Sequence, residues 1–81
     1  MTEQEIREAV VTALTGVAPD VEPDSIEPGV NFRDQFDFDS MDFLNFVTAL
    51  HKRFGIDIPE ADYGELNNLD GCVTYIAGKT K

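Results

Sequence analysis

Hydrophobic residues recur at intervals of three and four near the start of the chain, which is the spacing of one helix face. Thr2 and Glu5 precede them with the spacing of a capping box, in which each residue hydrogen-bonds the backbone of the other. The apolar positions are Ile6, Ala9, Val10, Ala13, Leu14 and Val17. The pattern predicts an amphipathic helix that ends near Gly16.

The helical periodicity disappears between Val17 and Phe38. Helix-breaking residues interrupt this stretch, and apolar residues are scattered between them. The breakers are Pro19, Pro23, Pro28 and Gly29, and the apolar residues are Val21, Ile26, Val30, Phe32 and Phe36. Unstructured loops of this length are uncommon in compact domains. We therefore expect an ordered loop that packs onto the core and contains one helical turn at residues 31–36.

A second amphipathic helix is predicted from Ser40 to Phe54, with Asp39 as its N-cap and Gly55 as its stop. At about 100° per residue, its residues include two sets on nearly opposite sides, one apolar and one of mixed polarity. The wider set is Phe43, Phe46, Val47, Leu50 and Phe54, and the other is Met41, Leu44, Asn45, Thr48 and Lys52. One simple core cannot bury both sets, so we expect the second to be exposed. Its Met and Leu suit a transient protein partner, although isolated exposed apolar residues are also common.

The last third of the chain predicts an extended linker and two more helices. Pro59 disfavours helix at the residue before it, so residues 56–59 are expected to be extended. Pro59 then suits the first position of a helix of one or two turns, which Gly64 is expected to cut short. Either Asn67 or Asn68 can cap a final helix that ends before Gly78. The apolar face of this helix is Leu69, Cys72, Val73 and Ile76, and Gly71 within it indicates a close helix approach.

These elements together predict an all-α fold in one domain spanning residues 1–81. The fold is a small four-helix bundle, with three main helices, one short third helix and a long ordered loop between the first two. We expect it to be a monomer.

Charge and composition exclude several function classes. A net charge of −10 opposes binding to nucleic acid and to anionic membranes, and favours basic partners. No apolar run approaches the roughly 20 residues of a membrane span, and the acidic, polar start does not resemble a signal peptide. These features predict a cytoplasmic protein with no membrane span. The lone Cys72 cannot form an internal disulfide or a zinc site, and is interpreted as a core residue.

The segment Asp39-Ser40-Met41-Asp42 places a hydroxyl at the start of the 40–54 helix. A catalytic serine needs a base held against its oxygen, but His51, the one histidine, lies eleven positions away and is expected to be solvated. Ser40 also lacks the Gly-x-Ser-x-Gly context of many hydrolases. We therefore predict no catalytic residues, and interpret Ser40 as a site that another enzyme modifies.

The acidic residues around this segment also allow a calcium-binding interaction protein. They are Asp20, Glu22, Asp24, Glu27, Asp34, Asp37, Asp39 and Asp42. An EF-hand loop needs alternating acids, a central glycine and a terminal bidentate glutamate, and no window of the chain fits. The sequence thus predicts no specific metal site.

The 40–54 helix opens with Asp-Ser-Met-Asp and is followed by Phe54-Gly55-Ile56-Asp57-Ile58-Pro59. Together with the order of the predicted helices, these two segments resemble the acyl carrier protein family. The resemblance implies a non-catalytic carrier. A phosphopantetheinyl transferase (holo-carrier synthase) would attach 4′-phosphopantetheine from coenzyme A to Ser40. Acyl groups would then be bound as thioesters to the thiol of this arm. Acyl-transferring and chain-modifying enzymes of fatty-acid, polyketide or related specialised biosynthesis are the implied partners. An aminoacyl or peptidyl carrier is the alternative.

The resemblance also suggests a partner-recognition surface and shows two departures from the family. The surface would comprise Asp39, Met41, Asp42, Leu44, Asn45 and Thr48. Asp37 stands where the family usually has a glycine, which suggests a left-handed turn there. The residues Asn45, His51, Lys52 and Arg53 replace a usual run of glutamates, which points to a specialised carrier. Finally, Phe43, Phe46, Phe54 and Tyr63 are expected to fill the interior, which favours short, polar or unsequestered cargo.

Overall fold

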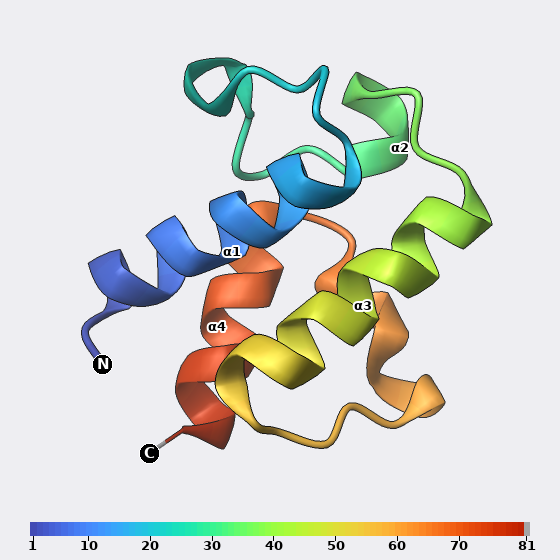
Figure 1. Ribbon diagram of the computed structural model, residues 1–81. Coiled ribbons are helices and arrows are strands. Elements are labelled where there is room, and N and C mark those ends of the chain that lie inside the picture. The colour runs from blue at the N-terminus through green and yellow to red at the C-terminus, as the bar shows by residue number, and fades with distance from the viewer. Residues whose placement is uncertain (81) are drawn as a thin grey trace.

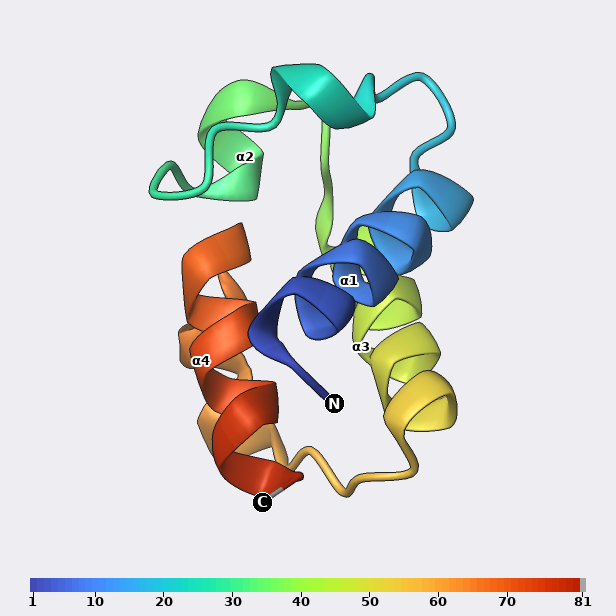
Figure 2. The ribbon, with the colours of Figure 1, turned by 90° about the vertical axis from the view of Figure 1, so that its left-hand side faces the viewer.

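Three long helices frame the protein in the computed structural model, which describes residues 1–80. They are α1 (Glu3–Val17), α3 (Ser40–Phe54) and α4 (Leu69–Lys79). Three shorter helical segments complete it: η1 (Pro23–Ser25), α2 (Phe32–Gln35) and η2 (Glu60–Leu66). α1 packs against both α3 and α4, and η2 packs against α4. The loop that carries η1 and α2 lies across one end of the bundle (Figures 1 and 2). The predicted all-α bundle is confirmed.

α1 begins with the predicted capping box. The Thr2 hydroxyl accepts a hydrogen bond from the Glu5 N–H at 3.1 Å, and the Glu5 carboxylate accepts one from the Thr2 N–H at 2.9 Å. Hydrogen bonding to the Glu5 carboxyl, first from the Thr2 N–H and then from the Thr2 side chain, lowers the pKa of that carboxyl because it favours the charged form. The helix runs one residue beyond Gly16 and buries its predicted apolar face through Ile6, Val10 and Leu14.

The loop between α1 and α3 is ordered by the side chains that it buries. Ile26, Phe32 and Phe38 are buried within the core. The Phe32 ring meets the Phe46 ring of α3 edge-on, with centroids 5.5 Å apart, and the Phe32 N–H donates to the Asn67 carbonyl at 2.8 Å. The loop is therefore tied to α3 and to the junction of η2 and α4. The packed loop and the helical turn at residues 31–36 are confirmed, whereas η1 was not predicted.

Three predicted helix boundaries are wrong. η2 does not end at Gly64 but continues to Leu66, because the fully buried Leu66 draws the last turn into the core. Pro59 is the N-cap of η2 and not its first helical residue. Gly78 lies inside α4, which continues to Lys79, whose ammonium lies over the Tyr75 ring, 5.5 Å from its centroid. Local glycine signals were overridden here by tertiary contacts.

The start of α4 lies close to the end of η2, as Gly71 suggested. The Asn68 side chain caps α4 by accepting a hydrogen bond from the Gly71 N–H at 2.7 Å. A Cβ atom at Gly71 would lie 2.5 Å from the Glu65 carbonyl oxygen, so a larger residue does not fit. The next residue, Cys72, is fully buried, and burial raises the pKa of its thiol to about 12. Cys72 is thus an unreactive core residue, as predicted.

We predict opposite effects of alanine at two glycines of α4. Gly71→Ala should lower the free energy of unfolding by about 1–3 kcal/mol, because the backbone of Glu65 must move away from the new Cβ. Gly78→Ala, with nothing within 4 Å of its Cβ, should raise it by about 0.4–1 kcal/mol, because alanine restricts the unfolded chain. Urea denaturation of both variants checks this. Equal stabilisation by both would contradict the close approach at Gly71.

Candidate functional site

Ser40 is the first residue of α3 and is exposed. The turn around it is held by a capping box between its two neighbouring acids. The Asp39 carboxylate accepts a hydrogen bond from the Asp42 N–H at 2.8 Å, and the Asp42 carboxylate accepts one from the Asp39 N–H at 3.4 Å. Both carboxylates are thus held at the first turn, where the helix dipole favours negative charge. The Ser40 hydroxyl is left facing solvent.

The chain reaches Ser40 in an extended conformation. Phe36 and Asp39 both have extended backbone angles, and Phe38 between them is buried in the core. Among the residues described, Gly55 alone has a positive φ, at 64°. The predicted left-handed turn at Asp37 is therefore wrong. Phe36 and Phe38 turn inward on either side, and Asp37 lies exposed between them without a positive φ, so this position needs no glycine.

A side chain that the sequence analysis overlooked lies beside Ser40. The Nη2 atom of Arg33, in α2, lies 3.5 Å from the Ser40 Oγ atom, within donating distance. The sequence holds one weak signal for it, since Arg33 is the only Lys or Arg between Arg7 and Lys52. Seven positions separate Arg33 from Ser40, and the chain between α2 and α3 is not helical, so helical periodicity does not predict their contact.

His51 cannot act as a base for Ser40. The two residues are on the same helix, eleven positions apart, which at about 1.5 Å per residue places them about 16 Å from each other. The His51 Nδ1 atom hydrogen-bonds the Ile56 carbonyl and so secures the turn after α3. His51 is exposed, but the expectation that it is merely solvated is wrong.

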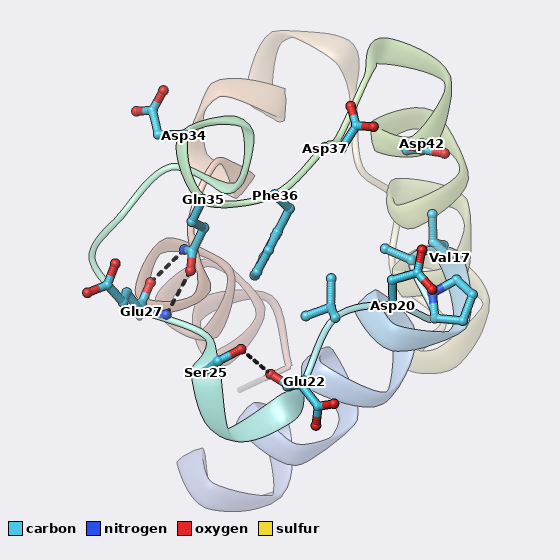
Figure 3. A pocket seen from close by; sticks show the side chains of 13 residues that line it. Val17, Asp20, Glu22, Ser25, Glu27, Asp34, Gln35, Phe36, Asp37 and Asp42 are labelled. Atoms are coloured by element: carbon cyan, nitrogen blue, oxygen red, sulfur yellow. Dashed lines mark hydrogen bonds between the residues drawn. The ribbon is translucent and has the colours of Figure 1, made fainter.

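Most of the acidic residues that suggested calcium binding in the sequence surround an open hollow (Figure 3). Glu27 and Asp34 lie on one side of it, and Asp37 and Asp42 lie on the other, with the Phe36 ring between them. The carboxylates are thus spread around an apolar centre instead of converging on one point. No three His, Cys, Asp or Glu side chains within residues 1–80 are placed to hold a metal ion.

α3 has the two faces that the sequence predicted. Phe46, Val47 and Leu50 are buried, and Phe43 and Phe54 are half-buried against the same core. On the other side, Met41 is 71% exposed and Leu44 is 51% exposed, and both Asn45 and Thr48 are exposed. The exposure of this second set is confirmed, whereas its role in partner recognition stays a prediction. The exposed His51, Lys52 and Arg53 form the last turn of the helix.

Comparison with known proteins identifies this arrangement. Residues 5–76 match the family model described as a phosphopantetheine attachment site. The chain belongs to the acyl carrier protein family. The acyl carrier protein of Campylobacter hominis is 32% identical over 78 residues, which cover 96% of this chain and 92% of that protein. The acyl carrier protein of Lactobacillus johnsonii is 33% identical over 76 residues, which cover 94% of each.

The fold comparison agrees. The structure of the acyl carrier protein from Enterococcus faecalis matches with a TM-score of 0.75 and 25% identity, over 98% of this chain and 99% of that one. Both the family and its phosphopantetheine cofactor, predicted from the Asp-Ser-Met-Asp context, are confirmed. Proteins of this family are carriers and not catalysts. None of the helices formed by residues 1–80 is long and apolar enough to cross a membrane.

The capping box at Ser40 predicts unequal effects of two neighbouring substitutions. Asp39→Ala should lower the free energy of unfolding by about 1 kcal/mol, because the Asp42 N–H loses its partner. Asp37→Ala removes the same charge from an exposed position outside the capping box and should change stability by less than about 0.5 kcal/mol. Thermal unfolding at one ionic strength compares the pair. Equal losses would show that the cap does not stabilise α3.

Proposed function

We propose that residues 1–81 form a carrier domain that holds acyl intermediates as thioesters on a 4′-phosphopantetheine arm attached to Ser40. The position of Ser40 carries this proposal. Its hydroxyl is exposed at the first residue of a capped helix, in a chain of the phosphopantetheine-attachment family. With His51 about 16 Å away, the hydroxyl has no histidine to activate it. Its exposure supports modification by a visiting enzyme.

Ser25, the other serine of the chain, is less suited than Ser40 to carry the cofactor. Ser25 lies in η1, and its hydroxyl donates a hydrogen bond to the Glu22 carbonyl at 2.9 Å. The Ser40 hydroxyl instead stands at the N-terminus of a helix of 15 residues, where the partial positive charge of the helix dipole stabilises a phosphodiester. Ser40 therefore fits the cofactor better than Ser25 on both geometry and electrostatics.

Attachment requires a phosphopantetheinyl transferase and coenzyme A. The Ser40 Oγ atom forms a bond to phosphorus, the phosphoanhydride bond of coenzyme A breaks, and 3′,5′-adenosine diphosphate leaves while the transferase takes up the hydroxyl proton. The attached arm then supplies a thiol that carries the acyl group. The protein contributes attachment, presentation and docking, and its partner enzymes perform the chemistry.

The charges on α3 favour a specialised carrier. Asp39 and Asp42 present carboxylates near Ser40, and Met41 and Leu44 add exposed apolar surface beside them. The far end of the helix is basic through His51, Lys52 and Arg53. Partners that dock along α3 must therefore be basic near Ser40 and tolerate or complement cations at its other end. We infer a carrier that serves a particular set of biosynthetic enzymes.

The aromatic packing between α3 and η2 favours short or polar cargo. The Phe43 ring of α3 meets the Tyr63 ring of η2 edge-on, with centroids 5.8 Å apart, and also meets the buried Phe38 ring at 6.5 Å. These rings occupy the space between the two elements. An acyl chain could enter only by displacing them, which costs packing contacts.

The attachment proposal predicts a covalent change at one residue. Incubation with a broad-specificity phosphopantetheinyl transferase and coenzyme A should increase the mass of the protein by one phosphopantetheinyl group. Ser40→Ala should gain none, and Ser25→Ala should gain as much as the unmutated protein. Because Cys72 is buried with its pKa raised, the loaded native protein should also show one rapidly reacting thiol and the unloaded protein none.

This incubation, together with a calcium titration, an ester hydrolysis assay and loading by amino-acid-activating enzymes, distinguishes the functional classes. No mass gain on the unmutated protein, or an equal gain on Ser40→Ala, would refute attachment at Ser40. A tight, stoichiometric calcium isotherm would support the interaction-protein alternative, and ester turnover without a transferase would support a hydrolase. Preferential loading by amino-acid-activating enzymes would instead indicate an aminoacyl carrier.

The cargo proposal predicts how stability depends on acyl length. Loading the carrier with acyl chains of increasing length should leave the Tm nearly constant beyond the shortest members, because the rings of Phe43 and Tyr63 exclude longer chains. Differential scanning calorimetry of each loaded form measures this. A Tm that continues to rise with chain length would show that long chains enter the bundle.

A further inference from the structure

Arg33 is placed unusually for a cation in so acidic a protein. The chain has 16 Asp and Glu residues but 6 Lys and Arg residues, and four of the acids lie within nine positions of Arg33 on its C-terminal side. An exposed guanidinium in such surroundings is expected to pair with a carboxylate. Yet the one ion pair found within residues 1–80 joins Arg7 to Asp70 at 3.0 Å. Arg33 is directed instead at the uncharged Ser40 hydroxyl.

The backbone of Arg33 is held firmly although its side chain is exposed. The Asn31 side chain accepts a hydrogen bond from the Arg33 N–H at 2.9 Å. The preceding residue, Phe32, is buried, and its ring lies edge-on to Phe38 with centroids 5.7 Å apart. Phe38 in turn precedes Ser40 by two positions. The Phe32–Phe38 contact thus joins the segment that carries Arg33 to the segment that precedes Ser40.

We infer that Arg33 is a phosphate-positioning residue, whose guanidinium binds the non-bridging oxygens of the phosphodiester carried by Ser40. The inference rests on the proposed attachment at Ser40. Those oxygens are bonded to a phosphorus that is itself bonded to Oγ, so they come within hydrogen-bonding reach of a guanidinium whose Nη2 lies 3.5 Å from Oγ. The planar fork of arginine matches two phosphate oxygens, and such pairs are among the stronger hydrogen bonds of proteins.

The charges near Ser40 indicate what the contact between Arg33 and the phosphodiester contributes. A phosphodiester at Ser40 adds a negative charge beside Asp39 and Asp42, which are held in the capping box and cannot move away without breaking it. Arg33 offsets this repulsion. It also fixes the base of the arm, so that the arm leaves the protein in a restricted direction between α2 and the exposed face of α3.

Nuclear magnetic resonance of the loaded carrier tests this inference without any enzyme assay. The chain has three arginines, so the Nε–Hε signals of Arg7, Arg33 and Arg53 can be followed separately. Attachment of the arm should shift the Arg33 signal and leave the signals of Arg7 and Arg53 in place. The ³¹P signal of the phosphodiester should move in Arg33→Gln but not in Arg53→Gln, which removes the same charge from the far end of α3. Arg33→Lys, which keeps the charge but not the fork, should give an intermediate shift.

The outcomes separate this inference from the proposed function. An Arg33 signal that does not move on loading, or equal ³¹P signals in the two glutamine variants, would refute phosphate positioning while the measured mass gain keeps attachment intact. Slower loading of Arg33→Gln with an unchanged ³¹P signal would show that Arg33 contacts the transferase, which also overturns the inference. Absence of any mass gain would refute attachment itself. The unloaded Arg33→Gln protein should unfold at the temperature of the unmutated protein, because the exposed side chain makes no ion pair within the described chain.

Discussion

The burial of Phe32 is the interaction on which the rest of the structure depends. Its ring contacts Phe36 just after α2, Phe38 before Ser40 and Phe46 of α3. Its N–H donates to the Asn67 carbonyl, between η2 and α4. Complete burial of such a side chain contributes about 1.5–3 kcal/mol. α2 has four residues, too few to be stable as an isolated helix. Its structure, and the path of the chain to Ser40, are therefore set by tertiary packing.

Helix capping places part of the strong negative charge where helix dipoles stabilise it. Thr2 with Glu5 and Asp39 with Asp42 place carboxylates at helix starts, and His51, Lys52 and Arg53 lie at the end of α3. Each charge thus interacts favourably with the nearer end of a helix dipole. The capped start of α3 is also where Ser40 is presented. The same hydrogen bonds that stabilise the helix therefore prepare the site.

α3 serves two purposes because its two sides are chemically different. Phe46, Val47 and Leu50 fix the helix in the bundle, while Met41 and Leu44 remain exposed next to Ser40. In the proposed carrier, a rigid α3 presents the flexible arm reproducibly, since the point of attachment does not move with the arm. The basic last turn distinguishes this surface from an all-acidic one, and under the same proposal its charge restricts which partners can dock.

The sequence alone determined the caps and bounds of α1 and α3, the two faces of α3, the burial of Cys72 and the exposed position of Ser40. These features follow from hydrogen bonds and periodicities within a few residues, which a linear pattern records directly. Tertiary structure alone decided that η2 continues past Gly64, that α4 includes Gly78, that Asp37 does not adopt a left-handed conformation, and that Arg33 meets Ser40. Burial of Leu66 extends η2, the contact of Lys79 with the Tyr75 ring accompanies the extension of α4, and the packing of Phe32 and Phe38 directs the chain from α2 to Ser40. Such contacts between distant residues outweigh the local preference of a single glycine or aspartate.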